Sequence, residues 1–161
     1  MIGILADSHD NLTALRRAVS LFRDYGCKLI IHAGDFVAPF AARELEKGGC
    51  PVRAVFGNCD GERRGLEAVL GPPNEIRDEP YSFEYSGKTF LLIHCHERLE
   101  SLLAERSPGV LIYGHTHKTD MRKAGGTLII NPGEAGGWLS GRSTVAVLDP
   151  MSWQAEILSL D

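Results

Sequence analysis

The sequence has no long uncharged apolar run, few cysteines and no excess of basic residues. The apolar stretch at residues 2–6 has no basic segment before it and is too short for a signal peptide or a membrane span. We therefore expect a cytoplasmic protein with no membrane association. The cysteines form no C-x-x-C pair, so reduced thiols are expected rather than a disulfide framework. They are Cys27, Cys50, Cys59 and Cys95.

The charge balance is mildly negative. Lys and Arg number 17 against 21 Asp and Glu, which gives a formal net charge of -4. General binding to a nucleic-acid backbone needs a basic face, so the composition argues against it. A small phosphate-ester substrate is still compatible, because bound metal ions would supply positive charge that the count omits. The 161 residues are enough for one sizeable core, and we expect a single domain over 1–161.

Strand-like and helical patterns alternate in the first half of the sequence. Short apolar runs predict three buried strands, and apolar residues at helical spacing predict a helix after each of the first two. The expected strands are 2–6, 28–32 and 52–56, and the expected helices are 12–25 and 39–47. Strands joined by crossover helices lie parallel, so the polar residues that follow them should gather at one edge of the sheet.

The second half carries signals of antiparallel pairs. A hairpin is expected to turn at Ser86-Gly87, and two more at residues 124–126 and 149–150. Helices are expected at 62–70 and 99–105, and a buried strand at 109–113. The combination predicts an α/β fold, a two-sheet β-sandwich of mixed strands flanked by helices.

Five polar clusters each follow an apolar, strand-like run. Singly they are weak signals, because Asp, His and Gly are ordinary loop residues. Together they contain four of the six histidines, which favours a metal site over a solvated polar edge. The clusters are Asp7-x-His9, Gly34-Asp35, Gly57-Asn58-x-Asp60, His94 and Gly114-His115-x-His117.

The donor types indicate which ions would bind. Imidazole and carboxylate without thiolate suit Mn²⁺, the expected ion, or Ni²⁺, Fe²⁺, Co²⁺ or Zn²⁺, better than a structural zinc cluster. The set exceeds what one tetrahedral site uses, so two ions with a bridging carboxylate are expected, and Asp35 is the best bridge. The two metal ions of such a site lie about 3.5–4 Å from each other and clamp the attacking and leaving oxygens of an in-line displacement.

The ordered set D-x-H, G-D, G-N-x-D, H and G-H-x-H resembles the calcineurin-like metallophosphoesterases. The short chain and the G-N-C-D form are similar to the small phosphodiesterase branch of YfcE type. The resemblance extends from Ile2 to about Gly133. It implies a two-sheet fold with flanking helices, of αββα type, and a metal-dependent phosphoesterase, with a phosphodiesterase as the expected form.

The resemblance also implies roles for individual residues. Asp60 would orient a neighbouring group. Asn11 would contact the phosphate, although helix capping explains it equally well. Two divalent ions would leave a charge of +1 after two carboxylates and a bridging hydroxide, and this hydroxide is expected to attack phosphorus in line. The implied ligands are Asp7, His9 and His117 for one ion, Asn58, His94 and His115 for the other, and Asp35 between them.

Two positions depart from the pattern. Cys59 stands where many members of the wider family have a histidine that protonates the leaving group, and a thiol is a poor substitute. Substrates with good leaving groups are therefore expected, with Cys59 at the substrate. His96 could compensate, although a hydrogen-bonded loop histidine explains it too. Cys95 replaces a glycine common in the small branch, which would narrow the pocket or change the loop.

Alternatives to this interpretation stay open at this point. A non-catalytic protein-binding scaffold on the same fold is the main one, although the intact ligand types disfavour it. The sequence argues against a dinucleotide-binding domain, because no G-x-G-x-x-G follows the first strand. A homo-oligomer is also open, because Trp138, Leu139 and Trp153 could form an exposed interface or pack in the core.

Overall fold

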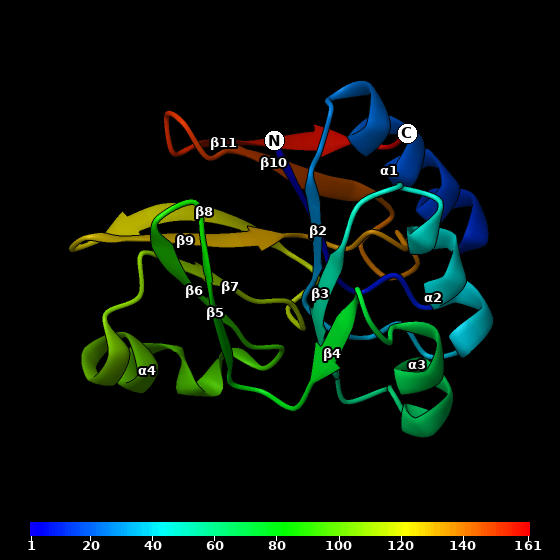
Figure 1. Ribbon diagram of the computed structural model, residues 1–161, viewed down its shortest axis with the longest axis horizontal. Helices are drawn as coiled ribbons and strands as arrows, with labels where there is room; N and C mark the ends of the chain where they lie inside the picture. Colours follow the sequence, from blue (N-terminus) through cyan, green and yellow to red (C-terminus); the bar gives the residue numbers. More distant parts are fainter.

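Two β-sheets pack face to face between outer layers of helices (Figure 1). The computed structural model describes residues 1–161. One sheet has six strands in the order β11-β10-β1-β2-β3-β4, and β1 to β4 run parallel. Its strands are β1 (Ile2–Leu5), β2 (Leu29–His32), β3 (Val52–Val55), β4 (Glu75–Arg77), β10 (Thr144–Asp149) and β11 (Gln154–Ser159).

The second sheet has five strands in the order β5-β6-β7-β9-β8. Its central strands β6, β7 and β9 are parallel, and hairpins attach β5 and β8 as antiparallel edges. The carboxyl ends of parallel strands therefore occur in both sheets. The strands are β5 (Tyr81–Tyr85), β6 (Lys88–Leu92), β7 (Val110–Ile112), β8 (Thr119–Ala124) and β9 (Thr127–Pro132).

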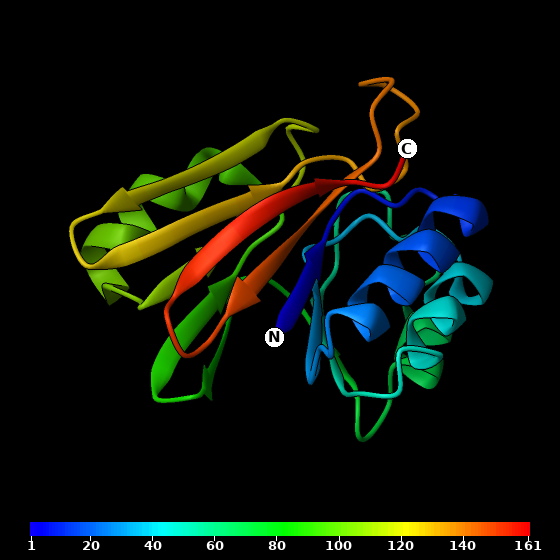
Figure 2. The same ribbon diagram turned by 90° about the horizontal axis from the view of Figure 1, so that it is seen from above.

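Helices cover the outer face of each sheet, as the view from above shows (Figure 2). The six-stranded sheet carries α1 (Leu12–Asp24), α2 (Pro39–Glu46) and α3 (Arg63–Val69), and the other sheet carries η1 (His96–Arg98) and α4 (Leu99–Arg106). The start of α1 is fixed by Asn11, whose side chain accepts a hydrogen bond from the Ala14 amide at 3.1 Å. None of the helices has the length and apolar character needed to span a bilayer.

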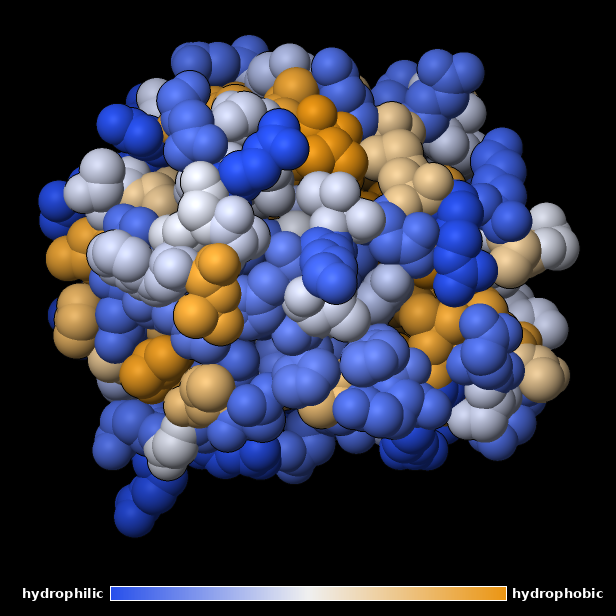
Figure 3. Space-filling view, turned by 180° about the vertical axis from the view of Figure 1, so that it is seen from behind, coloured by the Kyte–Doolittle hydropathy of each residue, from blue (hydrophilic) through white to orange (hydrophobic).

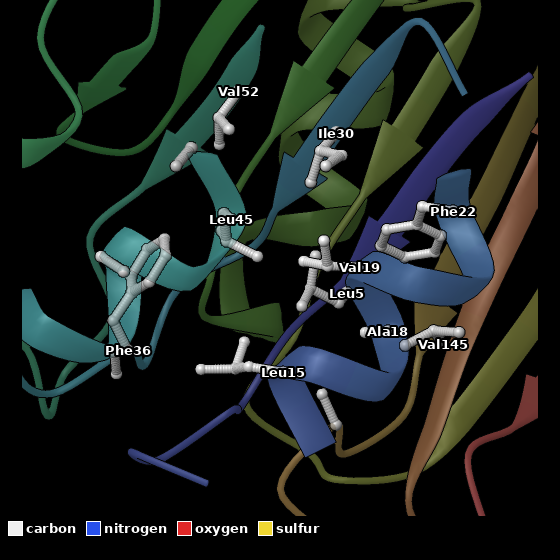
Figure 4. Close-up of a cluster of buried hydrophobic side chains, with 14 of the residues drawn as sticks. Leu5, Leu15, Ala18, Val19, Phe22, Ile30, Phe36, Leu45, Val52 and Val145 are labelled. Carbon is white, nitrogen blue, oxygen red and sulfur yellow. The ribbon is translucent and has the colours of Figure 1, made fainter. Parts of the chain in front are cut away.

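Three apolar clusters fill the spaces between the layers. The largest lies between the six-stranded sheet and α1 to α3, and Figure 4 shows Phe22, Leu15 and Leu45 pointing into it. The second lies between the two sheets and includes Ile4, Ile31 and other aliphatic side chains from both. The third joins α4 to the five-stranded sheet. On the face seen in Figure 3, hydrophobic residues form separate patches among hydrophilic ones.

The predicted fold class is confirmed, and the expected elements match the observed ones to within a few residues at their ends. Strand β4 was not predicted. It has only one apolar residue, Ile76, between Glu75 and Arg77, so it lacks the apolar run that identifies a buried strand. Pairing with β3 places it at the edge of the sheet. All four cysteines are free thiols, as expected.

Phe22 and Phe40 give a matched test of the helix–sheet core. The Phe22 ring is 1% exposed and lies against Gly3, where an added Cβ would come within 2.6 Å of the ring. Phe40 is 56% exposed on α2. Phe22→Ala should lower the free energy of unfolding by about 3–5 kcal/mol through lost burial and a cavity. Phe40→Ala should lower it by about 0.5 kcal/mol or less. Urea denaturation would measure both values, and an equal loss of unfolding free energy in the two variants would contradict this packing.

Candidate metal centre

The strand ends of both sheets meet at one place, and the predicted metal ligands follow them. The six-stranded sheet supplies residues after β1, β2 and β3, and the five-stranded sheet supplies residues after β6 and β7. All seven predicted ligands belong to this one neighbourhood, joined by the contacts described below. They are Asp7, His9, Asp35, Asn58, His94, His115 and His117.

Five of these ligands have left-handed backbone conformations. The φ angles are 51° at Asp7, 40° at His9, 61° at Asp35, 68° at His115 and 58° at His117. Non-glycine residues with positive φ are uncommon, cost about 1–3 kcal/mol each and cluster at functional sites. These left-handed residues lie in the loops after β1, β2 and β7.

Amide hydrogen bonds between neighbouring loops hold the left-handed turns. The amide of Asp7 donates to the Gly34 carbonyl at 3.0 Å, and the amide of His9 donates to the Asp35 carbonyl at 3.1 Å. The loops after β1 and β2 are therefore tied to each other. The Asp7 carboxylate also accepts the amide of His115 at 3.0 Å, which ties the first loop to the second sheet.

One donor group consists of Asp7, His9 and His117, whose ligand atoms all lie within 4.8 Å of one another. His117 Nε2 is 3.6 Å from an Asp7 carboxylate oxygen, and the rings of His9 and His117 stack with centroids 5.3 Å apart. His9 Nε2 is buried and has no hydrogen-bond partner. A buried polar atom without a partner is costly, and a bound cation would satisfy this one.

A second donor group forms around the side-chain oxygen of Asn58. His94 Nε2 lies 2.8 Å from Asn58 Oδ1, and His115 Nδ1 lies 2.9 Å from the same oxygen. The other ring nitrogen of His94 contacts the Ala33 carbonyl at 2.8 Å, which fixes the orientation of the ring.

The Asp35 carboxylate lies between the two groups. Its Oδ2 is 3.6 Å from His9 Nε2 and 3.5 Å from His94 Nε2. Its Oδ1 accepts the Cys59 amide at 2.8 Å. Gly57 leaves room for this carboxylate, because a Cβ there would lie 2.1 Å from Asp35 Oδ1. The arrangement explains why the G-N and G-D clusters occur together.

The Asp60 carboxylate accepts hydrogen bonds from the backbone of the loops that carry the donors. Its Oδ2 accepts the amides of Asp35 at 3.0 Å and Gly57 at 2.7 Å, and its Oδ1 accepts the Val37 amide at 2.8 Å. It therefore holds the backbone of the loop that carries Asp35. The orienting role expected for Asp60 stays a prediction.

Several supporting residues were missed by sequence reasoning. His117 Nδ1 lies 3.2 Å from the buried carboxylate of Glu134, which also accepts the Leu139 amide at 2.9 Å and the Ser140 amide at 2.7 Å. Glu79 accepts the amides of His94 and Cys95. Of these two residues, only Glu134 has a sequence feature that could have indicated it: it directly follows Asn131-Pro132-Gly133, the end of the segment that resembles the family.

His32 is a further buried group beneath the site. Its Nε2 is 2.9 Å from the Ser8 hydroxyl, and its Nδ1 accepts the Gly34 amide at 3.2 Å. Burial lowers its pKa, so the ring is neutral and acts as a hydrogen-bonding support between two ligand loops. This is the supporting function that an isolated histidine after a strand most often has.

Burial and the charges of neighbouring groups shift the pKa values of three donors, Asp7, Asp35 and His94. Burial raises the pKa of Asp7 to about 6. Burial alone would lower the pKa of His94, but its hydrogen bond and charge interaction with Asp35 outweigh this and raise it to about 9. Burial opposes ionisation of Asp35, yet His94 and the Cys59 amide hold its pKa well below its usual range. Buried, interacting acids and bases of this kind are typical of functional sites.

The remaining predicted site residues, Asn11, Cys59, Cys95 and His96, differ in their contacts and exposure. The Asn11 side chain caps α1 and donates to the Gly136 carbonyl at 2.7 Å, so the capping role is present and the phosphate contact stays a prediction. Burial raises the pKa of the Cys59 and Cys95 thiols to about 11. His96 is exposed and its ring stacks on His115 with centroids 5.9 Å apart.

The aromatic residues near the C-terminus have separate environments. Trp138 and Leu139 are exposed, and the Trp138 indole donates to the His9 carbonyl at 3.0 Å. Trp153 packs against the core between the sheets. Core packing is thus confirmed for one tryptophan, and an oligomeric interface stays a prediction.

The residues present fit divalent ions. Two sets of oxygen and nitrogen donors share Asp35, the buried His9 Nε2 has no hydrogen-bond partner, and the Glu134 carboxylate lies 3.2 Å from His117 Nδ1. Imidazole and carboxylate donors of this kind match first-row transition metals.

Comparison with known proteins places this site in a family. The family model of the calcineurin-like phosphoesterase superfamily domain matches residues 1–152. Phosphodiesterase MJ0936 of Methanocaldococcus jannaschii is 39% identical over 152 residues, covering 92% of each chain. Phosphodiesterase YfcE of Escherichia coli is 27% identical over 145 residues, covering 80% of this chain and 75% of its own. A solved archaeal phosphodiesterase shows a TM-score of 0.91 at 35% identity and covers 98% of both chains.

The chain therefore belongs to the calcineurin-like phosphoesterase superfamily, whose members use divalent metal ions. It is a hydrolase that acts on phosphoric ester bonds. The resemblance inferred from the polar clusters is confirmed, and so is its similarity to YfcE-type proteins.

Metal binding should be linked to proton release. The raised pKa of His94, about 9, means that its ring holds a proton at neutral pH in the metal-free protein, and an ion must displace it. Apparent affinity for Mn²⁺ should rise about tenfold per pH unit for each displaced proton, up to about pH 9. Below about pH 6 the protonation of Asp7 should weaken binding further.

Isothermal titration calorimetry in buffers of different ionisation enthalpy would count the released protons. His94→Gln should release one proton fewer than the natural protein near neutral pH. An affinity that stays constant between pH 6 and 9 would show that these groups do not compete with the ion.

Proposed function

We propose that the protein hydrolyses phosphodiesters with the help of two bound divalent metal ions, and that both ions are Mn²⁺. The observation that carries this proposal is the Asp35 carboxylate, whose Oδ2 is 3.6 Å from a histidine of one donor group and 3.5 Å from a histidine of the other. A carboxylate shared by two donor sets is the arrangement that a pair of ions requires. The names of the relatives, two phosphodiesterases, support a diester over a monoester.

Each donor group would hold one ion in this proposal. Asp7, His9 and His117 form the first group, and Asn58, His94 and His115 form the second, with Asp35 shared. When bound, the ions would polarise phosphoryl oxygens and lower the pKa of water to provide the nucleophile. Two divalent ions exceed the charge of the two carboxylates, so the loaded site would attract a small phosphate ester.

The chain's own residues would position the reacting groups. Asn58 presents its amide nitrogen beside the Cys59 thiol, 3.4 Å away, on the exposed side of the site. His96 is exposed, its ring stacks on that of His115, and it would donate a proton to the leaving group. The Cys59 thiol, with a pKa of about 11, is protonated at neutral pH but is a weak acid, so good leaving groups should react fastest.

Asp35→Asn tests the shared carboxylate. With bis(p-nitrophenyl) phosphate and Mn²⁺, turnover should fall by more than about a hundredfold, since loss of supporting partners alone costs 10–100-fold. Metal content should fall for both ions. Asp24→Asn, a matched change in an exposed residue at the end of α1, should leave turnover unchanged.

Two results would contradict the proposal. One is the absence of turnover by the natural protein with any of Mn²⁺, Ni²⁺, Co²⁺, Fe²⁺ and Zn²⁺. The other is full activity of Asp35→Asn. Folded protein that stays inert after metal addition would instead favour the scaffold alternative.

Glu134→Gln tests the support behind His117. The change preserves the side-chain shape and a carbonyl oxygen for the Leu139 and Ser140 amides, but it removes the charge 3.2 Å from His117 Nδ1. Affinity for Mn²⁺ should fall by about 10–100-fold, as for other outer partners of metal ligands. Metal titration at constant pH would measure this affinity. If both the affinity and the thermal midpoint of unfolding were unchanged, Glu134 would have no role in supporting His117.

A further inference from the structure

A pocket of about 330 Å³ adjoins the metal centre. It lies at the end of the sandwich where the start of β8 in one sheet faces the start of β10 and the adjacent strand β11 in the other. This volume is at the lower end of small-molecule sites, which span about 300–1,000 Å³. Its lining residues are His117, Lys118, Thr119, Ser140, Arg142, Thr144 and Ile157.

His117 is common to this pocket and the proposed metal site. The residue belongs to the first donor group and also lines the pocket. A substrate bound at the first donor group would therefore lie next to the pocket.

The charged residues lining the pocket are basic. Lys118 and Arg142 contribute two cations, and no carboxylate lines the wall. Neither side chain forms an ion pair within 4.0 Å, whereas the comparably exposed Arg63 and Arg77 pair with carboxylates. Several other surface cations are also unpaired, so the distinguishing feature is that these two share a pocket with a ligand histidine.

The carboxylate that contacts the lining residue His117 is already engaged. Glu134 is buried, contacts His117, and accepts the amides of Leu139 and Ser140. The Ser140 hydroxyl in turn donates to the Arg142 carbonyl at 2.9 Å, which holds the loop that carries the guanidinium. The local charge available to a ligand is thus positive in a protein whose net charge is -4.

We propose that Lys118 and Arg142 bind a second, non-reacting phosphate group of the substrate. This inference rests on the proposed phosphodiesterase function and specifies its substrate class: diesters that carry an additional phosphate. A guanidinium can bind phosphate in a bidentate manner and an ammonium binds it as a point charge. The apolar Ile157 provides a surface for the carbon skeleton that joins the two phosphates.

Two chromogenic esters separate this inference from the proposed function. Thymidine 5′-(p-nitrophenyl phosphate) has only the reacting phosphate, and the same ester with an added 3′-phosphate has a second one. Hydrolysis at the 5′ phosphorus releases p-nitrophenolate from both. The natural protein, loaded with Mn²⁺, should show a KM for the doubly phosphorylated ester lower by about tenfold, the scale of one charge-assisted contact.

Charge-removing variants then test the assigned residues. In Lys118→Gln and Arg142→Gln the ratio of kcat/KM for the two esters should fall toward one, and the double variant should abolish the preference. Lys123→Gln, an exposed lysine on β8 outside the pocket, should keep the full ratio. The preference should also shrink at high ionic strength.

The outcomes are distinguishable. Hydrolysis of both esters at equal kcat/KM by the natural protein, or a ratio that Lys118→Gln and Arg142→Gln leave unchanged, would overturn the second phosphate site while the phosphodiesterase function stands. No hydrolysis of either ester with any of the five metals would overturn the proposed function itself.

Discussion

The Asp35 carboxylate contacts histidines that come from opposite sheets. His9 follows a strand of the six-stranded sheet and His94 follows a strand of the five-stranded sheet, and each ring nitrogen lies within 3.6 Å of the same oxygen. This contact exists only because parallel strands in both sheets end at the same place. The site thus belongs to the packing of the whole sandwich and cannot be assigned to either sheet alone.

Keeping so many polar groups at a buried junction requires compensation. Left-handed conformations at five ligands cost free energy, and Asp7 and Asp35 are buried near each other. Backbone amides offset part of this cost: Asp60 accepts three of them, and Asp7 and Glu134 accept others. The surrounding hydrogen bonds therefore determine the backbone of the ligand loops, as a preorganised site requires.

Sequence reasoning recovered the fold class and anticipated that the candidate ligand residues lie together, because each of them follows an apolar strand. The order of strands and helices along the chain predicts parallel strands, and parallel strands bring the residues that follow them to one edge of the sheet. It could not find Glu134 or Glu79, since their function depends on contacts across loops that no local pattern records. It missed β4 because an edge strand with one apolar residue, Ile76, has no periodic signal.

The assignment of individual functions shows the same limit. Asn11 fits both a helix cap and a phosphate contact in sequence, and only coordinates show its side chain engaged with Ala14 and Gly136. The pocket beside His117 is built from residues of β8, β10 and β11 together with two loops. Lys118 and Arg142 are separated by a hairpin in the sequence, so no spacing rule would pair them.

The apolar layer between the sheets also sets the spacing of the donor groups, since one group is anchored mainly on each side of it. Side chains such as Ile4, Ile31 and Ile112 belong to that layer and offer no ligand atom, but they fix how far apart the two sheets lie. A truncation there that let the sheets settle closer by a fraction of an ångström would misalign ligands at the rim. Catalytic rate would then respond to core volume well before the protein lost its folded state.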